Sequence, residues 1–228
     1  MEEVGGNHLS KKRNAGVGKS CSRRKVLLLS SSNGRGCSTV IQEKLGNNYE
    51  VSGVVKPNAR LVNVVEDIDA LTKNFNKNDC VVVLGGTNDL DCYNSNYKEK
   101  FSSSLKKAQA VSLRTNVIFN SIPNRFDDQV LDVERVKANK EFHNLLNGQD
   151  ERNKENINVF YKTAAMERKY FTTHGLHFNK LGKEFLRESW VRIIKAFEGK
   201  LNNSSEAPTI QKTKPTFLEV CLGAKEKK

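Results

Sequence analysis

The chain has 228 residues, of which 37% are hydrophobic, and its mean hydropathy is −0.60. This length accommodates one domain with a sizeable core, and no apolar stretch approaches the roughly 20 residues that span a membrane. The N-terminus lacks the basic and then apolar segments of a signal peptide, and the five cysteines are scattered without a C-x-x-C pair. We therefore expect an intracellular protein, cytoplasmic or nuclear, with no membrane span, disulfide framework, metal site or cofactor.

The formal net charge is +12, and more than half of it lies at the two ends of the chain. Residues 1–24 contain six Lys and Arg against two acids, and residues 200–228 contain six against three. Their polar composition predicts a basic disordered arm at 1–24 and a basic flexible tail at 200–228, around a folded domain at 25–199. Such an arm can bind the phosphate backbone of nucleic acid non-specifically, and it can equally be a solvated tail. Both interpretations stay open.

Between the two ends, short apolar runs alternate with segments of helical spacing. The first apolar run, at 25–30, ends in a turn of serines and glycines that precedes a helical segment at 39–45. The run at 79–84 is uninterrupted, which is typical of a central parallel strand covered on both faces. The same patterns predict further strands at 49–55, 116–123 and 157–161, and further helices at 61–75, 97–110, 130–146 and 181–197.

Five strands that alternate with helices predict an α/β protein. The expected architecture is a three-layer α/β/α fold with a five-stranded parallel sheet in flavodoxin-like order. The polar segments 30–33, 85–89 and 174–177 then lie beyond the carboxyl ends of strands, at one edge of the sheet, where they can converge on one cleft. The aromatic residues of the last helix have core spacing: Phe185, Trp190 and Phe197.

These polar segments contain the residues needed for acyl transfer. Ser32, in the strand-to-helix turn, is the candidate nucleophile, and its own N–H is a candidate donor to an oxyanion. Asn88 offers a side-chain N–H as a second donor, and His177 could accept the hydroxyl proton. Each residue also has a structural interpretation: Ser32 as a helix N-cap, Asn88 as the brace of its own turn, His177 as an ordinary loop histidine. The residues alone leave these alternatives open.

The order of these segments resembles that of the SGNH/GDSL hydrolases, which are esterases and lipases on a flavodoxin-like sheet. The resemblance covers residues 25–197. In the first block of that family a Gly-Asp-Ser turn carries the nucleophile, and this chain has Ser30-Ser31-Ser32 there. In the second block Asn58 stands in place of a glycine, and the third block, Gly-x-Asn-Asp, is intact as Gly86-Thr87-Asn88-Asp89. The fifth block, Asp-x-x-His, reads His174-Gly175-Leu176-His177, so the base is present and the acid is replaced.

The resemblance implies a role for each of these positions. The segments 30–35 and 174–179 are also similar to those of a subgroup associated with mobile elements in insects and other eukaryotes. By analogy with the family, the catalytic residues would be Ser32 and His177, the oxyanion hole would be formed by Ser32, Asn58 and Asn88, and the supporting residues would be Gly86, His174 and Asp89.

Two functions of different classes follow from this resemblance. The first is an SGNH-type serine ester hydrolase that cleaves small acyl esters through a Ser-His dyad, weakened because His174 offers the base no negative charge. The second is a catalytically inactive SGNH-like binding module, whose basic arm contacts nucleic acid or whose cleft holds a protein partner. The sequence predicts neither the acyl group nor the oligomeric state.

Overall fold

The computed structural model of the protein describes residues 22–91, 93–147 and 159–202. Most of the predicted arm and tail, and the first two residues of the predicted fifth strand, lie outside these residues. The elements in chain order are β1 (Arg24–Ser30), η1 (Ser32–Gly34), α1 (Cys37–Leu45), β2 (Tyr49–Val55), α2 (Leu61–Val64), α3 (Ile68–Leu71), β3 (Cys80–Leu84), η2 (Thr87–Asp89), α4 (Tyr97–Ser112), β4 (Asn116–Asn120), α5 (Gln129–Asn147), β5 (Val159–Tyr161), η3 (Thr163–Ala165), η4 (Arg168–Tyr170) and α6 (Lys180–Asn202).

The strands form one parallel sheet in the order β2-β1-β3-β4-β5. Four strands of five to seven residues make up its body, and β5 adds three residues at one edge. The chain passes from β1, inside the sheet, to β2 at one edge. It then returns past β1 to β3 and continues through β4 to β5 at the other edge. The predicted α/β class with a parallel sheet between helices is confirmed, and the strand order is the flavodoxin-like one.

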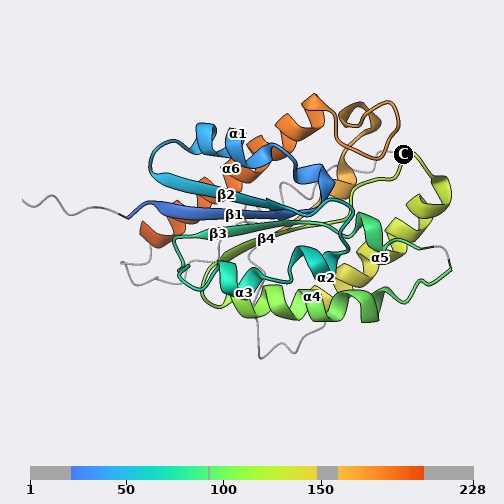
Figure 1. Ribbon diagram of the computed structural model, residues 1–228, viewed down its shortest axis with the longest axis horizontal. Coiled ribbons are helices and arrows are strands. Elements are labelled where there is room, and N and C mark those ends of the chain that lie inside the picture. Colours follow the sequence, from blue (N-terminus) through green and yellow to red (C-terminus); the bar gives the residue numbers. More distant parts are fainter. Residues whose placement is uncertain (1–21, 92, 148–158, 203–228) are drawn as a thin grey trace, which may run out of the picture.

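Helices cover both faces of the sheet (Figure 1). Helices α1 and α6 lie on one face, and α2, α3, α4 and α5 lie on the other. The side chains of β1 divide between these layers, since Val26 and Leu28 belong to the core on the α1 side, whereas Leu27 and Leu29 belong to the core on the α4 side. Burial on both faces explains why the run at 26–29 is continuously apolar.

The single helix predicted at 61–75 is wrong, because the structure has two one-turn helices there, α2 and α3. The break at 65–67 is stabilised by Lys56, whose ammonium donates to the Asn63 carbonyl at 2.9 Å and to the Asp67 carboxylate at 3.0 Å. The apolar spacing was nevertheless informative, since Leu61, Val64 and Ile68 are buried on the same face of the sheet. The spacing identified the buried side of this segment and not its continuity.

Helix α6 is joined to the sheet by a buried hydrogen bond. The indole N–H of Trp190 donates to Asn120 Oδ1 at 3.0 Å, and Asn120 Nδ2 donates to the Val83 carbonyl at 2.8 Å. Trp190 and Phe197 are buried as predicted, but Phe185 is 37% exposed and packs beside the Tyr170 ring at 4.9 Å. Within the described ranges, no helix has the length and apolarity needed to cross a membrane.

Candidate active site

Backbone hydrogen bonds fix the turn after β1 between its two neighbouring strands. The N–H of Ser31 donates to the Leu84 carbonyl at the end of β3, at 3.0 Å, and the N–H of Lys56 donates to the Ser30 carbonyl at 2.9 Å. The segments that follow β1, β2 and β3 therefore leave the same edge of the sheet side by side. This edge holds the candidate residues of the first three blocks.

Ser32 is the first residue of η1 and is half-buried. It caps neither neighbouring helix, because the N-cap of η1 is Ser31 and that of α1 is Gly36. Neither the hydroxyl nor the backbone N–H of Ser32 forms a hydrogen bond with another residue of the described part of the chain. Both groups are thus available to a ligand, as a nucleophile and an oxyanion donor require.

The buried side chain of Ser30 is accommodated by Gly34. Ser30 is buried, and its hydroxyl has no hydrogen-bond partner among the described residues. A Cβ at Gly34 would lie 2.0 Å from Ser30 Oγ, so residue 34 has to be a glycine while Ser30 keeps this position. Ser31, the N-cap residue of η1, forms no side-chain cap bond to it. The turn is therefore shaped by its backbone and by Gly34.

The loop before α6 brings His177 to this turn, across 144 residues of sequence. Nδ1 of His177 lies 3.3 Å from Oδ1 of Asn33, the residue after Ser32, and the same oxygen accepts the backbone N–H of Phe178 at 3.2 Å. No hydrogen bond joins His177 to Ser32 in the structure, and catalytic hydrogen bonds are often long before substrate binds. Sequence reasoning did not identify Asn33, although its position beside Ser32 was a usable signal.

The loop that carries His177 is held by its own backbone and by Arg168. The N–H of Thr172 donates to the His177 carbonyl at 2.8 Å, and the Arg168 guanidinium donates to the carbonyls of Thr172 and Thr173, both at 2.6 Å. Gly175 has φ of 91°, and a Cβ there would lie 2.7 Å from the backbone carbon of Phe126. The loop therefore packs closely against the segment after β4.

The surroundings of His177 favour its neutral form. Partial burial is the largest cause that lowers the pKa of His177 below its ordinary value of 6.5, and the charges of Lys183, His174 and Arg35 lower it further. The Asp127 carboxylate acts in the opposite direction and raises this pKa. A histidine that is neutral at pH 7 can accept a proton, as a general base must.

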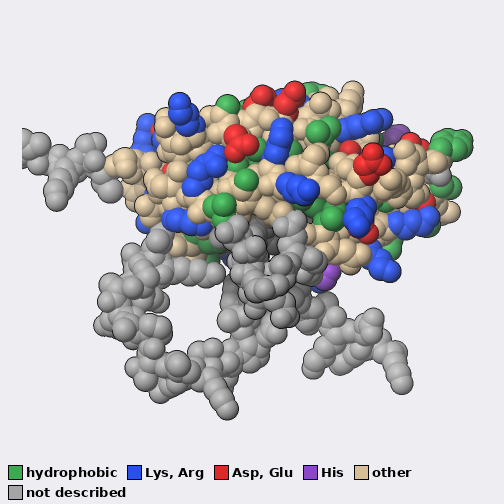
Figure 2. Space-filling model, turned by 90° about the horizontal axis from the view of Figure 1, so that it is seen from below, with side chains coloured by type: hydrophobic (Ala, Val, Ile, Leu, Met, Phe, Trp, Pro, Cys, Tyr) green, Lys and Arg blue, Asp and Glu red, His purple; other side chains and the backbone are tan. Residues whose placement is uncertain are grey.

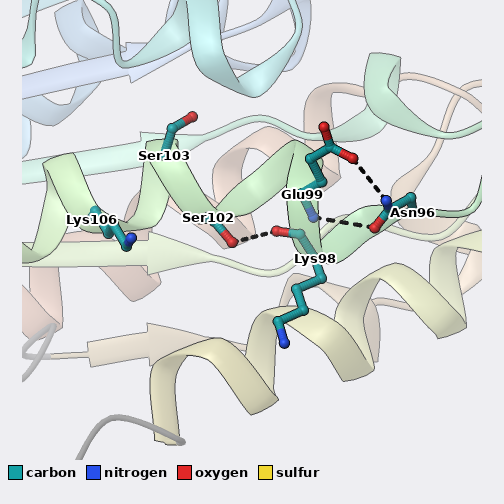
Figure 3. A pocket seen from close by; sticks show the side chains of 6 residues that line it. All are labelled: Asn96, Lys98, Glu99, Ser102, Ser103 and Lys106. Carbon is teal, nitrogen blue, oxygen red and sulfur yellow. Dashed lines mark hydrogen bonds between the residues drawn. The ribbon is translucent and has the colours of Figure 1, made fainter.

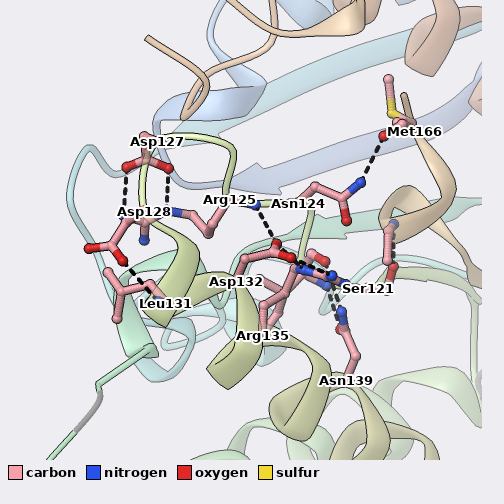
Figure 4. A network of polar contacts seen from close by, with 12 residues as sticks. Ser121, Asn124, Arg125, Asp127, Asp128, Leu131, Asp132, Arg135, Asn139 and Met166 are labelled. Atoms are coloured by element: carbon pink, nitrogen blue, oxygen red, sulfur yellow. Dashed lines mark hydrogen bonds and ion pairs between the residues drawn. The ribbon is translucent and has the colours of Figure 1, made fainter. Parts of the chain in front are cut away.

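His174 stands at the position of the family acid, where it forms no hydrogen bond to His177 among the described residues. The carboxylate that interacts with both histidines belongs to Asp127, in the segment between β4 and α5. Both of its oxygens are bound by the Arg125 guanidinium, at 2.8 Å each (Figure 4). This pairing lowers the pKa of Asp127. Sequence reasoning considered other acids and missed Asp127, which had no spacing relation to the motif.

Asn88 and Asn58 lie on adjacent loops, and both are exposed. Nδ2 of Asn88 donates to the Ala59 carbonyl at 3.0 Å, so Asn88 braces the neighbouring loop rather than its own turn. A primary amide has two N–H groups, which leaves one for a ligand. Asn58 has φ of 58°, in the left-handed region where glycine and asparagine are favoured. Asparagine is therefore compatible with the left-handed backbone at position 58.

Gly86 and Asp89 support the third block. Gly86 has φ of 97°, and a Cβ there would lie 2.8 Å from Ile122 Cγ1. Asp89 is 4% exposed, and its Oδ2 accepts the backbone N–H of Leu61, the first residue of α2, at 2.8 Å. Burial raises the pKa of Asp89 from 3.8 to about 6. Asp89 thus fastens the loop of Asn58 to the loop of Asn88.

We expect Asp89→Asn to stabilise the protein more at pH 8 than at pH 4. Because the folded state raises the pKa of Asp89, the carboxyl group stabilises the fold fully below pH 3.8, and this contribution is lost as the pH rises through about 6. Asparagine retains an acceptor for Leu61 and has no charge to bury. The difference in free energy of unfolding between variant and wild type should grow by up to about 3 kcal/mol over this range, measured by urea denaturation. A pH-independent difference would contradict it.

A separate hollow of about 530 Å³ lies on the surface of α4 (Figure 3). Its polar groups bond within the first turns of that helix: the Glu99 N–H donates to Asn96 Oδ1 at 3.4 Å, and Asn96 Nδ2 donates to the Glu99 carboxylate at 2.8 Å. These are capping interactions, and none of the candidate residues lines the hollow. In the described part of the chain, no cluster of His, Cys, Asp and Glu could hold a metal ion.

No protein-family model matches the chain, and no curated protein matches it either. Solved structures of esterases and lipases do match. The aryl esterase of M. smegmatis has a TM-score of 0.61 at 12% identity, over 76% of this chain and 99% of that one. A carbohydrate esterase family 3 protein from Talaromyces cellulolyticus has a TM-score of 0.58 at 16% identity, over 77% and 99%.

The lipase/acylhydrolase from Enterococcus faecalis is similar to the same extent, with a TM-score of 0.57 at 15% identity, over 76% of this chain and 96% of that one. All three of these neighbours are esterases or lipases. Likeness at such low identity concerns the arrangement of the backbone. The chain therefore has the α/β/α fold of SGNH-type hydrolases.

Proposed function

We propose that the protein is a serine ester hydrolase of SGNH type that cleaves small acyl esters. The observation that carries the proposal is the contact between Asn33 and His177, which brings the histidine loop to the residue beside Ser32. The esterase fold and the free hydroxyl and N–H of Ser32 support it. The segments 30–35 and 174–179 support placement in the mobile-element subgroup, and we propose an intracellular site of action, cytoplasmic or nuclear.

In the proposed reaction Ser32 Oγ attacks the ester carbonyl carbon while the hydroxyl proton passes to His177. The carbonyl oxygen becomes an oxyanion, which the N–H groups of Ser32, Asn58 and Asn88 stabilise. As the tetrahedral intermediate collapses, the bond to the alcohol oxygen breaks and that oxygen takes the proton from His177. Water then attacks the acyl-serine with His177 as base, which releases the carboxylic acid and restores the Ser32 hydroxyl.

The experiment that tests this proposal combines hydrolysis with covalent labelling. The wild-type chain should hydrolyse p-nitrophenyl acetate or butyrate and react with a fluorophosphonate probe at Ser32, whereas Ser32→Ala should do neither. Mass spectrometry of the labelled peptide identifies the modified residue. Failure of the probe to label Ser32, with no hydrolysis above background, would contradict the proposal.

The charge of the arm favours a second candidate function, binding of nucleic acid. Residues 1–24 contain six Lys and Arg against two acids. On the face of the domain shown in Figure 2, Lys and Arg side chains lie scattered between acidic and neutral ones and form no single patch. The excess of positive charge in residues 1–24 makes the arm a candidate for contact with phosphate.

We expect deletion of residues 1–21, which keeps Arg24 at the start of β1, to weaken retention of RNA or DNA. At 50 mM salt the full chain should bind labelled single-stranded nucleic acid, and its affinity should fall steeply as salt increases, because binding releases counterions. Fluorescence anisotropy over a salt series measures both quantities for the full and the truncated chain. Equal affinities of the two chains would remove the arm from this role.

A further inference from the structure

Asn33 is a buried amide that contacts two groups of the histidine loop. Only 3% of the surface of Asn33 is exposed to solvent. Oδ1 accepts the backbone N–H of Phe178 at 3.2 Å and lies 3.3 Å from Nδ1 of His177. The side chain thus connects the turn of the nucleophile to the loop of the base.

These contacts determine which nitrogen of His177 carries the proton. The N–H of Phe178 can only donate, so the atom of Asn33 that faces it has to be the oxygen. An oxygen acceptor beside Nδ1 requires a proton on that nitrogen. The lone pair of the neutral imidazole is then on Nε2, which is the nitrogen that accepts the serine proton in Ser-His hydrolases.

We propose that Asn33 is a positioning residue that takes over from the missing acid, holding His177 in its Nδ1–H tautomer with Nε2 as the base. The inference rests on the proposed function for its catalytic consequence, whereas the tautomer can be observed without any substrate. An amide oxygen orients the imidazole but carries no full negative charge. Asn33 therefore fulfils the orienting role of an acid and lacks its stabilisation of the imidazolium.

The charged groups around His177 come from four segments. Arg35 follows η1, Lys183 is on α6, His174 is in the histidine loop and Asp127 is in the segment after β4. Lys183 is fixed by donating to the Arg35 carbonyl at 3.2 Å. A carboxylate at position 33 would be ionised among these cations, and it would favour the protonated imidazole. Asn33→Asp should therefore raise the pKa of His177, whereas Asn33→Ala should free the ring.

The first measurement is the protonation of the ring nitrogens in the full chain, from ¹⁵N chemical shifts across a pH titration, with His177 assigned by its loss in His177→Gln. Wild type and Asn33→Asp should show Nδ1 protonated and Nε2 unprotonated above the pKa, and Asn33→Ala should shift toward Nε2–H. Asn144→Ala is the matched control, because it removes an exposed amide on α5 that is no part of the candidate site, and it should keep the wild-type tautomer.

The second measurement is the pH profile of p-nitrophenyl butyrate hydrolysis. Asn33→Ala should lower kcat/KM by at least about 10-fold, since removal of the orienting group of a triad costs up to about 10⁴. Asn33→Asp should retain activity and move the acid limb upward by about one pH unit. Asn144→Ala should leave the midpoint of the acid limb unchanged.

An Nε2–H tautomer in wild type, or an unchanged Nδ1–H tautomer in Asn33→Ala, would overturn the role of Asn33. If Asn33→Ala does not fold, Asn33→Asp decides, because an unchanged His177 titration in that variant also overturns it. The spectra give these answers even if the wild-type chain hydrolyses no ester, which would count against the proposed function alone.

Discussion

Replacement of Ser32 by alanine is expected to lower kcat/KM for p-nitrophenyl butyrate by about 10³-fold or more, since the variant has no atom to form the acyl-enzyme. The fold should be unaffected, because the Ser32 hydroxyl forms no hydrogen bond with a described residue and caps no helix. Thermal unfolding within about 2 °C of wild type would show that the loss is chemical.

His177→Gln should cause a loss of similar size. Serine and base act as one unit, so the double variant Ser32→Ala/His177→Gln should be no slower than either single variant. His143→Gln on α5 provides a control for the removal of a histidine and should keep wild-type rates. Losses that multiply in the double variant would show that the two residues do not act in one step.

The pH dependence of wild type follows from the same histidine. His177 must be neutral to accept the proton, and its pKa lies below 6.5. Activity should therefore be at its plateau at pH 7 and decline only below the ordinary histidine range. Asp89, with a pKa of about 6, is buried against α2 and changes the stability of the fold in this pH range. The measurement of kcat/KM therefore needs conditions in which the protein is fully folded at every pH, with unfolding monitored in parallel.

The sequence was sufficient to predict the layers of the fold. The apolar runs of β1 and β3 are buried on both faces, because each of these strands has a neighbour on either side and helices above and below. The apolar spacing did not reveal the break between α2 and α3, which Lys56 spans with hydrogen bonds from the end of β2. Phe185 had core spacing, but it is 37% exposed and packs against the Tyr170 ring at the edge of the core.

Local backbone conformation was predictable from residue type. Gly86 and Asn58 both have positive φ, of 97° and 58°, which glycine and asparagine adopt more readily than other residues. Asn33 and Asp127 were not predicted, because their proximity to His177 arises from loops that meet only in the folded chain. The resemblance to the family placed the expected partner of His177 at residue 174. In the structure, the atom beside His177 Nδ1 is Oδ1 of Asn33, which lies in the turn after β1.

Asn88→Ala is expected to lower kcat by about 10² to 10³-fold, because it removes a side-chain donor to the oxyanion. The variant also loses the hydrogen bond to the Ala59 carbonyl, which is exposed and contributes about 1 kcal/mol to stability. The fold should therefore persist, and steady-state kinetics with p-nitrophenyl butyrate should show the loss in kcat more than in KM. A variant within a few-fold of wild type would exclude Asn88 from the oxyanion hole.

Asn58 provides the matched comparison, because its expected donor is the backbone N–H. Asn58→Gly keeps that N–H and readily adopts φ of 58°, so kcat should stay within about 3-fold of wild type. Asn58→Val keeps the N–H but resists this conformation at a cost of about 1 to 2 kcal/mol. If the N–H of residue 58 stabilises the oxyanion, the valine variant should lose kcat while the glycine variant does not. Equal rates in both variants would assign stabilisation to Ser32 and Asn88 alone.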